Sequence, residues 1–276
     1  ILDKGLDIHF WIMGRSDIFN KSGNKLIQLL KNAGLWGVFW GVEFGTNRQL
    51  RLYNKPVSIE QNINAINLLK RNDLIVEIGF IMFHPYVTFD DLKKNAEFLL
   101  KVNESHIWWY FASRLELYPG ASIIKKLKRE NLLLSKYDYT RIYGYKFRTR
   151  KMHRLVNVVT TANNYLKNYD NLIWNINQIT PSLKNIMFSN NSNFPLKNKL
   201  FDIISSLNQI KTNIGRTNYE FFLKYIELCK KANKVDMKTF IEVHIMKQKC
   251  EINKLNALVS LLRKIIKKIP SSTDSM

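Results

Sequence analysis

Apolar runs of strand length alternate with amphipathic runs of helical length through the first half of the chain. The apolar runs are nearly continuous, which is typical of parallel strands that are buried on both faces. Such alternation predicts an α/β fold, with either a parallel sheet or a (β/α) barrel. We expect strands at residues 6–13, 35–43, 74–83 and 106–117, and helices at 23–33, 58–72, 88–101 and 121–132.

Two of these expected helices carry polar start signals. Ser58 precedes a run with apolar residues at three- and four-residue spacing, which suits an N-cap. Thr88 is followed by Asp90 and Asp91, which places a capping side chain and negative charge where the helix dipole favours both. We therefore expect the helices to begin directly after Ser58 and Thr88.

The strand pattern disappears after about residue 134. The remaining apolar positions predict helices at 148–169, 197–212, 216–233 and 237–268, separated by the polar stretches "SNNSNFPLKN" and "IGRTN". We expect two domains, an α/β domain over residues 1–134 and a basic all-α domain over residues 135–276.

Composition limits the cellular setting and the kinds of site. The chain has 276 residues, of which 46% are hydrophobic, so it can bury a sizeable core. Its two cysteines, Cys229 and Cys250, are too far apart for a C-x-x-C motif and indicate neither a disulfide framework nor a zinc site. A reducing cytoplasm is therefore the expected location. No apolar run approaches the roughly 18 residues of a membrane span, and no signal peptide is recognisable.

The net charge of +21 raises nucleic acid or another anionic surface as a partner. Residues 141–154 combine basic side chains with Tyr143, Tyr145 and Phe147, a mixture that can hold single-stranded nucleic acid by phosphate contact and stacking. A compositional bias towards lysine and asparagine over the whole chain explains the same charge without a partner, and we favour that interpretation. The basic residues of the stretch are Arg141, Lys146, Arg148, Arg150, Lys151 and Arg154.

Polar or ionisable residues follow the carboxyl end of every expected strand, the place where (β/α) barrels carry their chemistry. The most distinctive is Glu43, an acid between Gly41 and Gly45, because glycines allow a ligand to approach the backbone closely. Three alternatives stay open: Glu43 pairs with Arg48 or caps a helix, Arg15 is a solvated loop charge, and His84 is a half-buried histidine. The residues at the four strand ends are Arg15 and Asp17, then Glu43, then His84, then Arg114 to Tyr118.

Several of these segments, in order, resemble the later half of a radical S-adenosylmethionine (SAM) core. The group concerned often carries a cobalamin-binding domain before that core. Its fourth strand has a G-V-E-S-G-like turn, its fifth a G-x-I-x-G-x-x-P-like segment, and its sixth runs into Y-P-G-T. The corresponding segments here are "GVEFG" (41–45), "GFIMFHP" (79–85) and "YPGA" (118–121), and the resemblance covers about residues 6–133.

This resemblance implies strands three to six of a partial (β/α) barrel, SAM, and a 4Fe–4S cluster whose electron cleaves SAM to a 5′-deoxyadenosyl radical. By the same analogy Glu43 faces the ribose or methionine part of SAM, Arg15 pairs with its carboxylate, and Gly79, Ile81 and Pro85 lie along its adenine. Asp17, His84, Arg114 and Tyr118 would face a substrate of unknown identity. Cobalamin use stays open, as does the choice among methyl transfer, ring formation and methylthiolation.

The sequence departs from this family in ways that matter for activity. The C-x-x-x-C-x-x-C loop that holds the cluster is absent, so no metal ligand is expected in this chain. Phe44 replaces the usual serine and Phe83 a frequent glycine. We therefore expect a radical SAM enzyme lacking its N-terminal part, inactive by itself. The alternative is a non-enzymatic basic partial barrel that binds nucleic acid or a protein.

Overall fold

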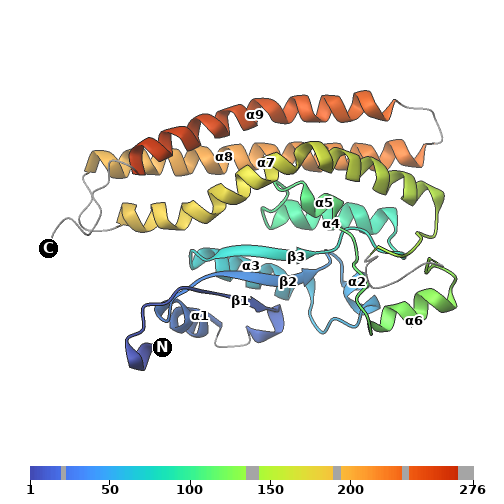
Figure 1. The fold of residues 1–276 in the computed structure, drawn as a ribbon, viewed down its shortest axis with the longest axis horizontal. Coiled ribbons are helices and arrows are strands. Elements are labelled where there is room, and N and C mark those ends of the chain that lie inside the picture. Colours follow the sequence, from blue (N-terminus) through green and yellow to red (C-terminus); the bar gives the residue numbers. More distant parts are fainter. Residues whose placement is uncertain (20–22, 135–142, 189–193, 232–235, 267–276) are drawn as a thin grey trace.

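The computed structural model describes residues 1–276 except 20–22, 135–142, 189–193, 232–235 and 267–276. An N-terminal layer of strands and short helices lies against a layer of three long helices that run side by side (Figure 1). The strands are β1 (Phe10–Gly14), β2 (Leu35–Glu43) and β3 (Ile75–Phe80), and short 3₁₀ turns occur at η1 (Leu2–Lys4) and η2 (Ser16–Ile18). The helices are α1 (Gly23–Asn32), α2 (Asn47–Leu52), α3 (Ile59–Arg71), α4 (Phe89–Lys101), α5 (Trp109–Ala112), α6 (Ser122–Arg129), α7 (Arg150–Phe188), α8 (Phe194–Lys230) and α9 (Met237–Ile266).

The three described strands form one parallel sheet in the order β1-β2-β3. Successive side chains of β2 alternate between its two faces, as in any strand. Val38, Trp40 and Val42 are buried on the face that α1 and α3 cover. Phe39 and Glu43 lie on the opposite face, which is partly open and is approached by α7. This second face carries the candidate site.

The predicted helix starts at Ser58 and Thr88 are confirmed. The Ser58 hydroxyl accepts the N–H of Gln61, while the Gln61 side chain accepts the N–H of Ser58. Thr88 and Asp91 make the same reciprocal pair at the start of α4. Each capping box satisfies two backbone N–H groups that the first helical turn would otherwise leave without partners.

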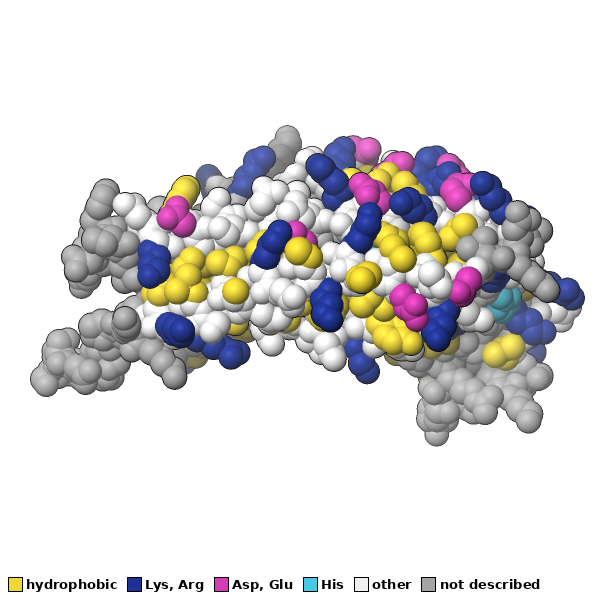
Figure 2. Space-filling view, turned by 90° about the horizontal axis from the view of Figure 1, so that it is seen from above, with side chains coloured by type: hydrophobic (Ala, Val, Ile, Leu, Met, Phe, Trp, Pro, Cys, Tyr) yellow, Lys and Arg dark blue, Asp and Glu magenta, His cyan; other side chains and the backbone are white. Residues whose placement is uncertain are grey.

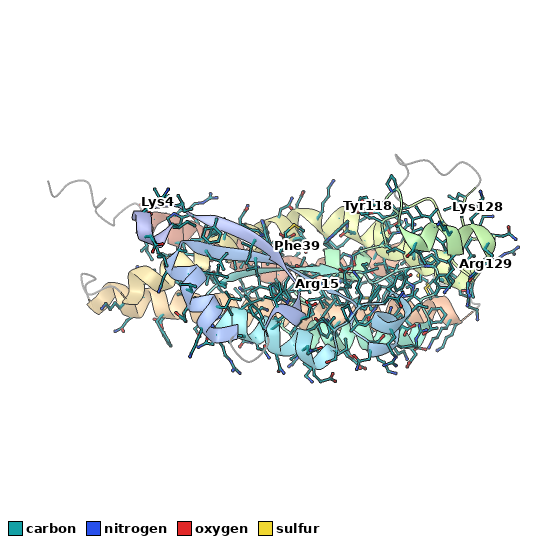
Figure 3. The ribbon with its side chains drawn as sticks, turned by 90° about the horizontal axis from the view of Figure 1, so that it is seen from below. Lys4, Arg15, Phe39, Tyr118, Lys128 and Arg129 are labelled. Carbon is teal, nitrogen blue, oxygen red and sulfur yellow. The ribbon has the colours of Figure 1, made fainter. Side chains whose placement is uncertain are left out.

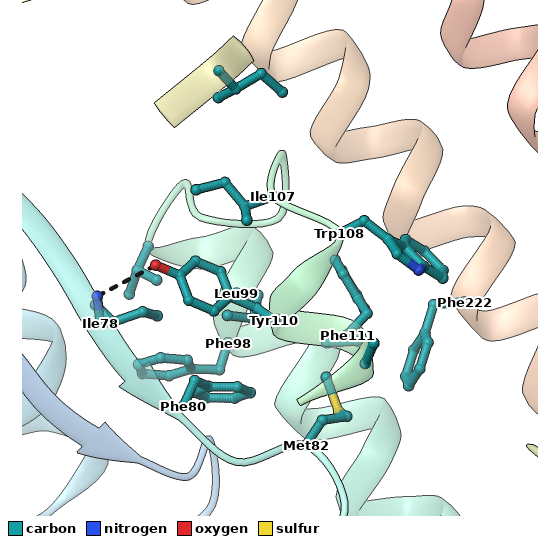
Figure 4. Packing of buried hydrophobic residues seen from close by; sticks show 14 of the residues in the cluster. Ile78, Phe80, Met82, Phe98, Leu99, Ile107, Trp108, Tyr110, Phe111 and Phe222 are labelled. Atoms are coloured by element: carbon teal, nitrogen blue, oxygen red, sulfur yellow. Dashed lines mark hydrogen bonds between the residues drawn. The ribbon is translucent and has the colours of Figure 1, made fainter. Parts of the chain in front are cut away.

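The strand expected at residues 106–117 is wrong. This segment instead contains α5. It pairs with the chain just beyond β3 through an isolated parallel bridge between Phe83 and Arg114, and it adds no strand to the sheet. Its apolar residues are buried because helices surround the turn: Trp108 and Phe111 stack on each other and both contact Phe222 of α8 (Figure 4). A short apolar run does not distinguish a buried strand from a buried helical turn.

The helix break expected at "IGRTN" is also wrong, because α8 continues through Gly215. A Cβ atom at this position would lie 2.5 Å from the Ser105 hydroxyl oxygen and 3.2 Å from the backbone nitrogen of His106. Glycine is therefore needed here for close packing and not for a turn. Next to it, the Asn218 side chain donates to the backbone carbonyl of Ser105, fixing α8 against that segment.

One hydrophobic cluster contains residues of the sheet and of all three long helices. α4 packs against α8, and α5 packs against α7.

The segment 135–142, where the predicted domain boundary falls, lies outside the described residues. The division into residues 1–134 and 135–276 therefore stays a prediction. Within the described residues the sheet has three strands, so the structure supports a mixed α/β fold without the fourth strand of the expected barrel.

Candidate functional site

The carboxyl ends of β1, β2 and β3 meet at one edge of the sheet because the strands are parallel. At this edge the pairing of β2 with β3 shifts between Gly41 and Glu43. Glu43 has φ of 68°, a left-handed conformation that a non-glycine residue adopts at a cost of order 1–3 kcal/mol. The chain just beyond β3 holds this strained turn, since the Ile81 N–H donates to the Glu43 carbonyl at 2.7 Å.

The Glu43 and Arg15 side chains flank Gly41. A Cβ atom built on Gly41 would lie 3.4 Å from Glu43 Oε1 and 3.6 Å from Arg15 Cγ. An acid from β2 and a guanidinium following β1 thus come together over a backbone that has no side chain of its own. Such a pair offers both an acceptor and a forked donor to a zwitterionic ligand.

Both charged groups already have partners within the chain. Lys55 Nζ lies 3.1 Å from Glu43 Oε1, and Arg15 Nη2 lies 2.6 Å from Asp17 Oδ2. The hydrogen bond from Arg15 lowers the pKa of the Asp17 carboxyl. Arg48, the partner weighed for Glu43, pairs instead with Asp91, and Thr46 caps α2, so both structural alternatives for Glu43 are wrong.

Two hollows open at this edge. The larger is a cavity of about 760 Å³ between the open face of the sheet, the 107–118 segment and α7. The smaller, of about 390 Å³, lies over the ends of β1 and β2. Phe39 and Glu43 line both, so they form the boundary between the hollows. Figure 3 shows Arg15 and Phe39 near the middle of the molecule, with Tyr118 towards the α6 end.

The structure brings seven of the nine residues expected at the site to these hollows. Glu43, Gly79, Ile81, Arg114 and Tyr118 line the larger cavity, and Arg15 and Asp17 line the smaller one with Glu43. The Phe39 ring covers Gly79, where an added Cβ would lie 2.9 Å from the ring.

The other two, His84 and Pro85, are buried and line neither hollow. The His84 ring contacts the side-chain amide of Gln49 at 2.9 Å and accepts the backbone N–H of Tyr86. Its burial lowers the pKa to about 3, so the ring is neutral. His84 thus supports the turn from behind and does not face the cavity.

Sequence reasoning missed two carboxylates of the larger cavity. Glu77 lies on β3 beside Phe39, on the open face of the sheet, and its burial raises the pKa of its carboxyl. An acid inside the apolar run "LIVEIGF" was the available signal. Asp170 comes from α7 and accepts the backbone N–H groups of Trp108 and Trp109, each at 2.8 Å. Nothing in the sequence placed α7 over the sheet.

The basic and aromatic stretch near residue 145 does not offer rings to nucleic acid. Tyr145 and Phe147 are buried, and Arg114 lies over the ring of Tyr143 at 4.5 Å. The aromatic side chains therefore hold Arg114 at the cavity wall. Seen from above, the Lys and Arg side chains of the helical layer are spread over its length among hydrophobic ones, and no single basic patch stands out (Figure 2).

The described residues do not fit an iron–sulfur cluster. They contain no group of three His, Cys, Asp or Glu side chains able to hold a metal ion. The chain's two cysteines are both free; Cys229 is buried and Cys250 is exposed. A 4Fe–4S cluster normally needs more cysteine thiolates than the two that this sequence contains. Of the described helices, none has the length and apolar character needed to cross a membrane.

Comparison with known proteins identifies the class of protein that this chain resembles. No family model matches the chain. Its homologues are radical SAM enzymes, so the resemblance seen in the motifs is confirmed, and the relatives are enzymes.

Two curated relatives match the chain over limited segments. The 4′-phospho-dehydrooxetanocin synthase of Priestia megaterium is 44% identical over 68 residues, which is 24% of this chain and 9% of that protein. The anaerobic magnesium-protoporphyrin IX monomethyl ester cyclase of Rubrivivax gelatinosus is 43% identical over 117 residues, or 42% of this chain and 20% of the cyclase. The matched segments are thus a small part of each relative.

A solved structure extends the likeness to the helical half. The cobalamin-dependent SAM radical enzyme OxsB superposes with a TM-score of 0.55 at 20% identity, covering 99% of this chain and 45% of OxsB. At this identity the likeness concerns the fold alone. The chain therefore shares its sheet and its long helices with slightly less than half of OxsB.

Proposed function

We propose that this chain belongs to a radical SAM enzyme and binds SAM at the carboxyl edge of its sheet. The observation that carries the proposal is the left-handed turn at Glu43, which sets a carboxylate across Gly41 from Arg15. Strained non-glycine residues persist where the surrounding structure over-determines them, and they cluster at ligand sites. The homology to radical SAM enzymes supports SAM as the ligand.

Each proposed contact follows from the chemistry of the side chain. Glu43 accepts hydrogen bonds from the ribose hydroxyls or the ammonium group of SAM. Arg15 exchanges its partly exposed partner Asp17 for the SAM carboxylate, for which its guanidinium fork is equally suited. Gly79 and Ile81 form the wall beside the adenine, whereas Pro85 is buried and does not line the cavity.

The proposal assigns cofactor chemistry only as far as the residues fit. SAM and a reduced 4Fe–4S cluster together supply radical chemistry in this class. Because two cysteines do not fit a cluster, its thiolates would have to come from residues outside this chain. The fold likeness to OxsB favours a cobalamin-dependent member. The cytoplasm, indicated by cysteine usage, remains the expected location.

The test is calorimetric SAM titration of the chain and of its Glu43→Gln variant. Glutamine keeps the size and removes the charge, so SAM binding should weaken by roughly 1.5–3 kcal/mol, as expected for a hydrogen bond to a charged group. The melting temperature should change little, since the pair with Lys55 is partly exposed and such pairs contribute little to stability.

Lys55→Gln is the matched control, because it breaks the same ion pair and leaves the acid in place. It should retain SAM affinity. The proposal fails if Glu43→Gln binds SAM as tightly as the unchanged chain. If, in addition, the melting temperatures of both variants fall by the same amount, Glu43 has a structural role in its pair with Lys55.

A further inference from the structure

The larger cavity is acidic in a chain of net charge +21. Four carboxylates and two cations line it, and both cations are engaged: Lys55 pairs with Glu43, and Arg114 lies over the Tyr143 ring. One of the four carboxylates, Glu116, accepts hydrogen bonds from the hydroxyls of Tyr118 and Tyr143. Among the residues that the structure describes, no cation forms an ion pair with the other two, Glu77 and Asp170.

Tyr110 connects the segments that carry these two acids. Its hydroxyl accepts the backbone N–H of Ile78, the residue after Glu77 (Figure 4), and Asp170 accepts the backbone N–H of Trp109, the residue before Tyr110. Burial first, then the Glu104 carboxylate, and more weakly Glu77 and Asp170, hold the pKa of this hydroxyl well above its usual range. Both carboxylates line the same cavity, and we call the part that they line the inner end of the cavity. Glu77 lies in the middle of β3, paired with Phe39 of β2, whereas Glu43 lies at the carboxyl end of β2 and pairs with Phe80.

Neither acid has a cationic partner among the described residues. No hydrogen bond or ion pair reaches the Glu77 carboxylate, and burial alone raises its pKa. Asp170 is held by two backbone N–H groups, yet its burial still raises its pKa to about 7. A half-buried carboxylate without a partner is costly in free energy, so the chain retains a cost that a bound cation would remove.

The walls of the inner end suit an organic cation. Phe39, Trp109, Tyr110 and Trp174 line the same cavity as the two acids. Aromatic faces attract ammonium groups and also pack against the apolar body that carries them. A hydrated metal ion would use the carboxylates and gain nothing from the rings.

We propose that the inner end binds the ammonium group of an amine-bearing organic substrate, with Glu77 as the residue that selects for positive charge. The inference rests on the proposed function for one point only, that this cavity is where a substrate meets SAM. SAM would occupy the Glu43 end and the amine the Glu77 end of the same cavity.

The test uses two probes of the same shape and opposite charge, tryptamine and indole-3-propionate, each titrated calorimetrically into the full chain. Tryptamine should bind at least about tenfold more tightly than indole-3-propionate, and Glu77→Gln should weaken tryptamine by about tenfold, the effect of losing a hydrogen bond to a charged group. Glu97→Gln is the matched control, since it removes the same charge from the exposed face of α4, outside the cavity lining.

Equal affinity for the two probes, no binding of either, or unchanged tryptamine affinity in Glu77→Gln would overturn the inference. SAM titrations of the same variants separate it from the proposed function. Glu77→Gln should keep SAM affinity, whereas Glu43→Gln should lose SAM affinity and keep tryptamine binding. Charge selection at Glu77 without SAM binding would leave the inference standing and remove the proposed function.

Discussion

Three buried histidines, His84, His106 and His244, are held neutral inside the molecule. Burial lowers the pKa of His84 and of His244 to about 3, and lowers that of His106 well below its usual value. In the unfolded chain each would titrate near 6.5. Below that pH the unfolded state binds protons that the folded state does not, so each histidine makes folding less favourable as the pH falls.

Replacing His84 with Gln should therefore flatten the loss of stability in acid. Between pH 6 and pH 4 the unfolding free energy of the unchanged chain should fall more steeply than that of His84→Gln, by about 1.4 kcal/mol per pH unit. Asp170, whose raised pKa has the opposite sign, is common to both proteins and cancels in the difference. Urea unfolding at several pH values measures the slopes; parallel slopes would contradict neutral burial of His84.

At the site, the sequence located the residues that end strands but not those within strands or helices. Glu43 was conspicuous because glycines bracket it, and parallel strands necessarily bring their carboxyl ends to one edge. Its left-handed backbone could not be foreseen, because it depends on the shifted pairing with β3. Glu77 was overlooked because it lies inside an apolar run. Asp170 reaches the cavity from a helix about 90 residues further on in sequence.

At the scale of elements, local signals were reliable where they were chemical and weak where they were only apolar. The capping residues Ser58 and Thr88 start their helices as expected, because the side chain itself makes the hydrogen bonds. The apolar run at 106–117 was misassigned, because burial by α7 and α8 produces the same composition as a buried strand. Gly215 was read as a break although it serves packing between α8 and Ser105.

The packing role of Gly215 predicts that Gly215→Ala destabilises the protein. Helix propensity alone predicts a gain of about 1 kcal/mol, but the added Cβ would lie 2.5 Å from the Ser105 hydroxyl oxygen. Overpacking of this kind costs roughly 1–3 kcal/mol. Thermal or urea unfolding checks the sign. Adding Ser105→Gly removes the clashing hydroxyl and should recover part of the loss, whereas a stabilised single variant would show that α8 does not need close approach here.

At the scale of the whole molecule, the long helices form the second wall of the site. α7 supplies Asp170 and Trp174 to the larger cavity, and α8 packs on the α5 turn that shapes it. The all-α half, which sequence analysis treated as a separate basic domain, thus takes part in the cavity. The fold likeness to OxsB covers both halves, and one hydrophobic cluster contains residues of both.

The central claim is that SAM binds where β1, β2 and β3 end. Hydrogen–deuterium exchange of the full chain, with and without SAM, tests this location directly because each backbone amide reports on its own segment. We predict slower exchange on adding SAM in peptides covering residues 12–18, 41–46 and 79–85, with α9 unchanged. No change in these peptides at saturating SAM, or protection confined to the long helices, would contradict the account.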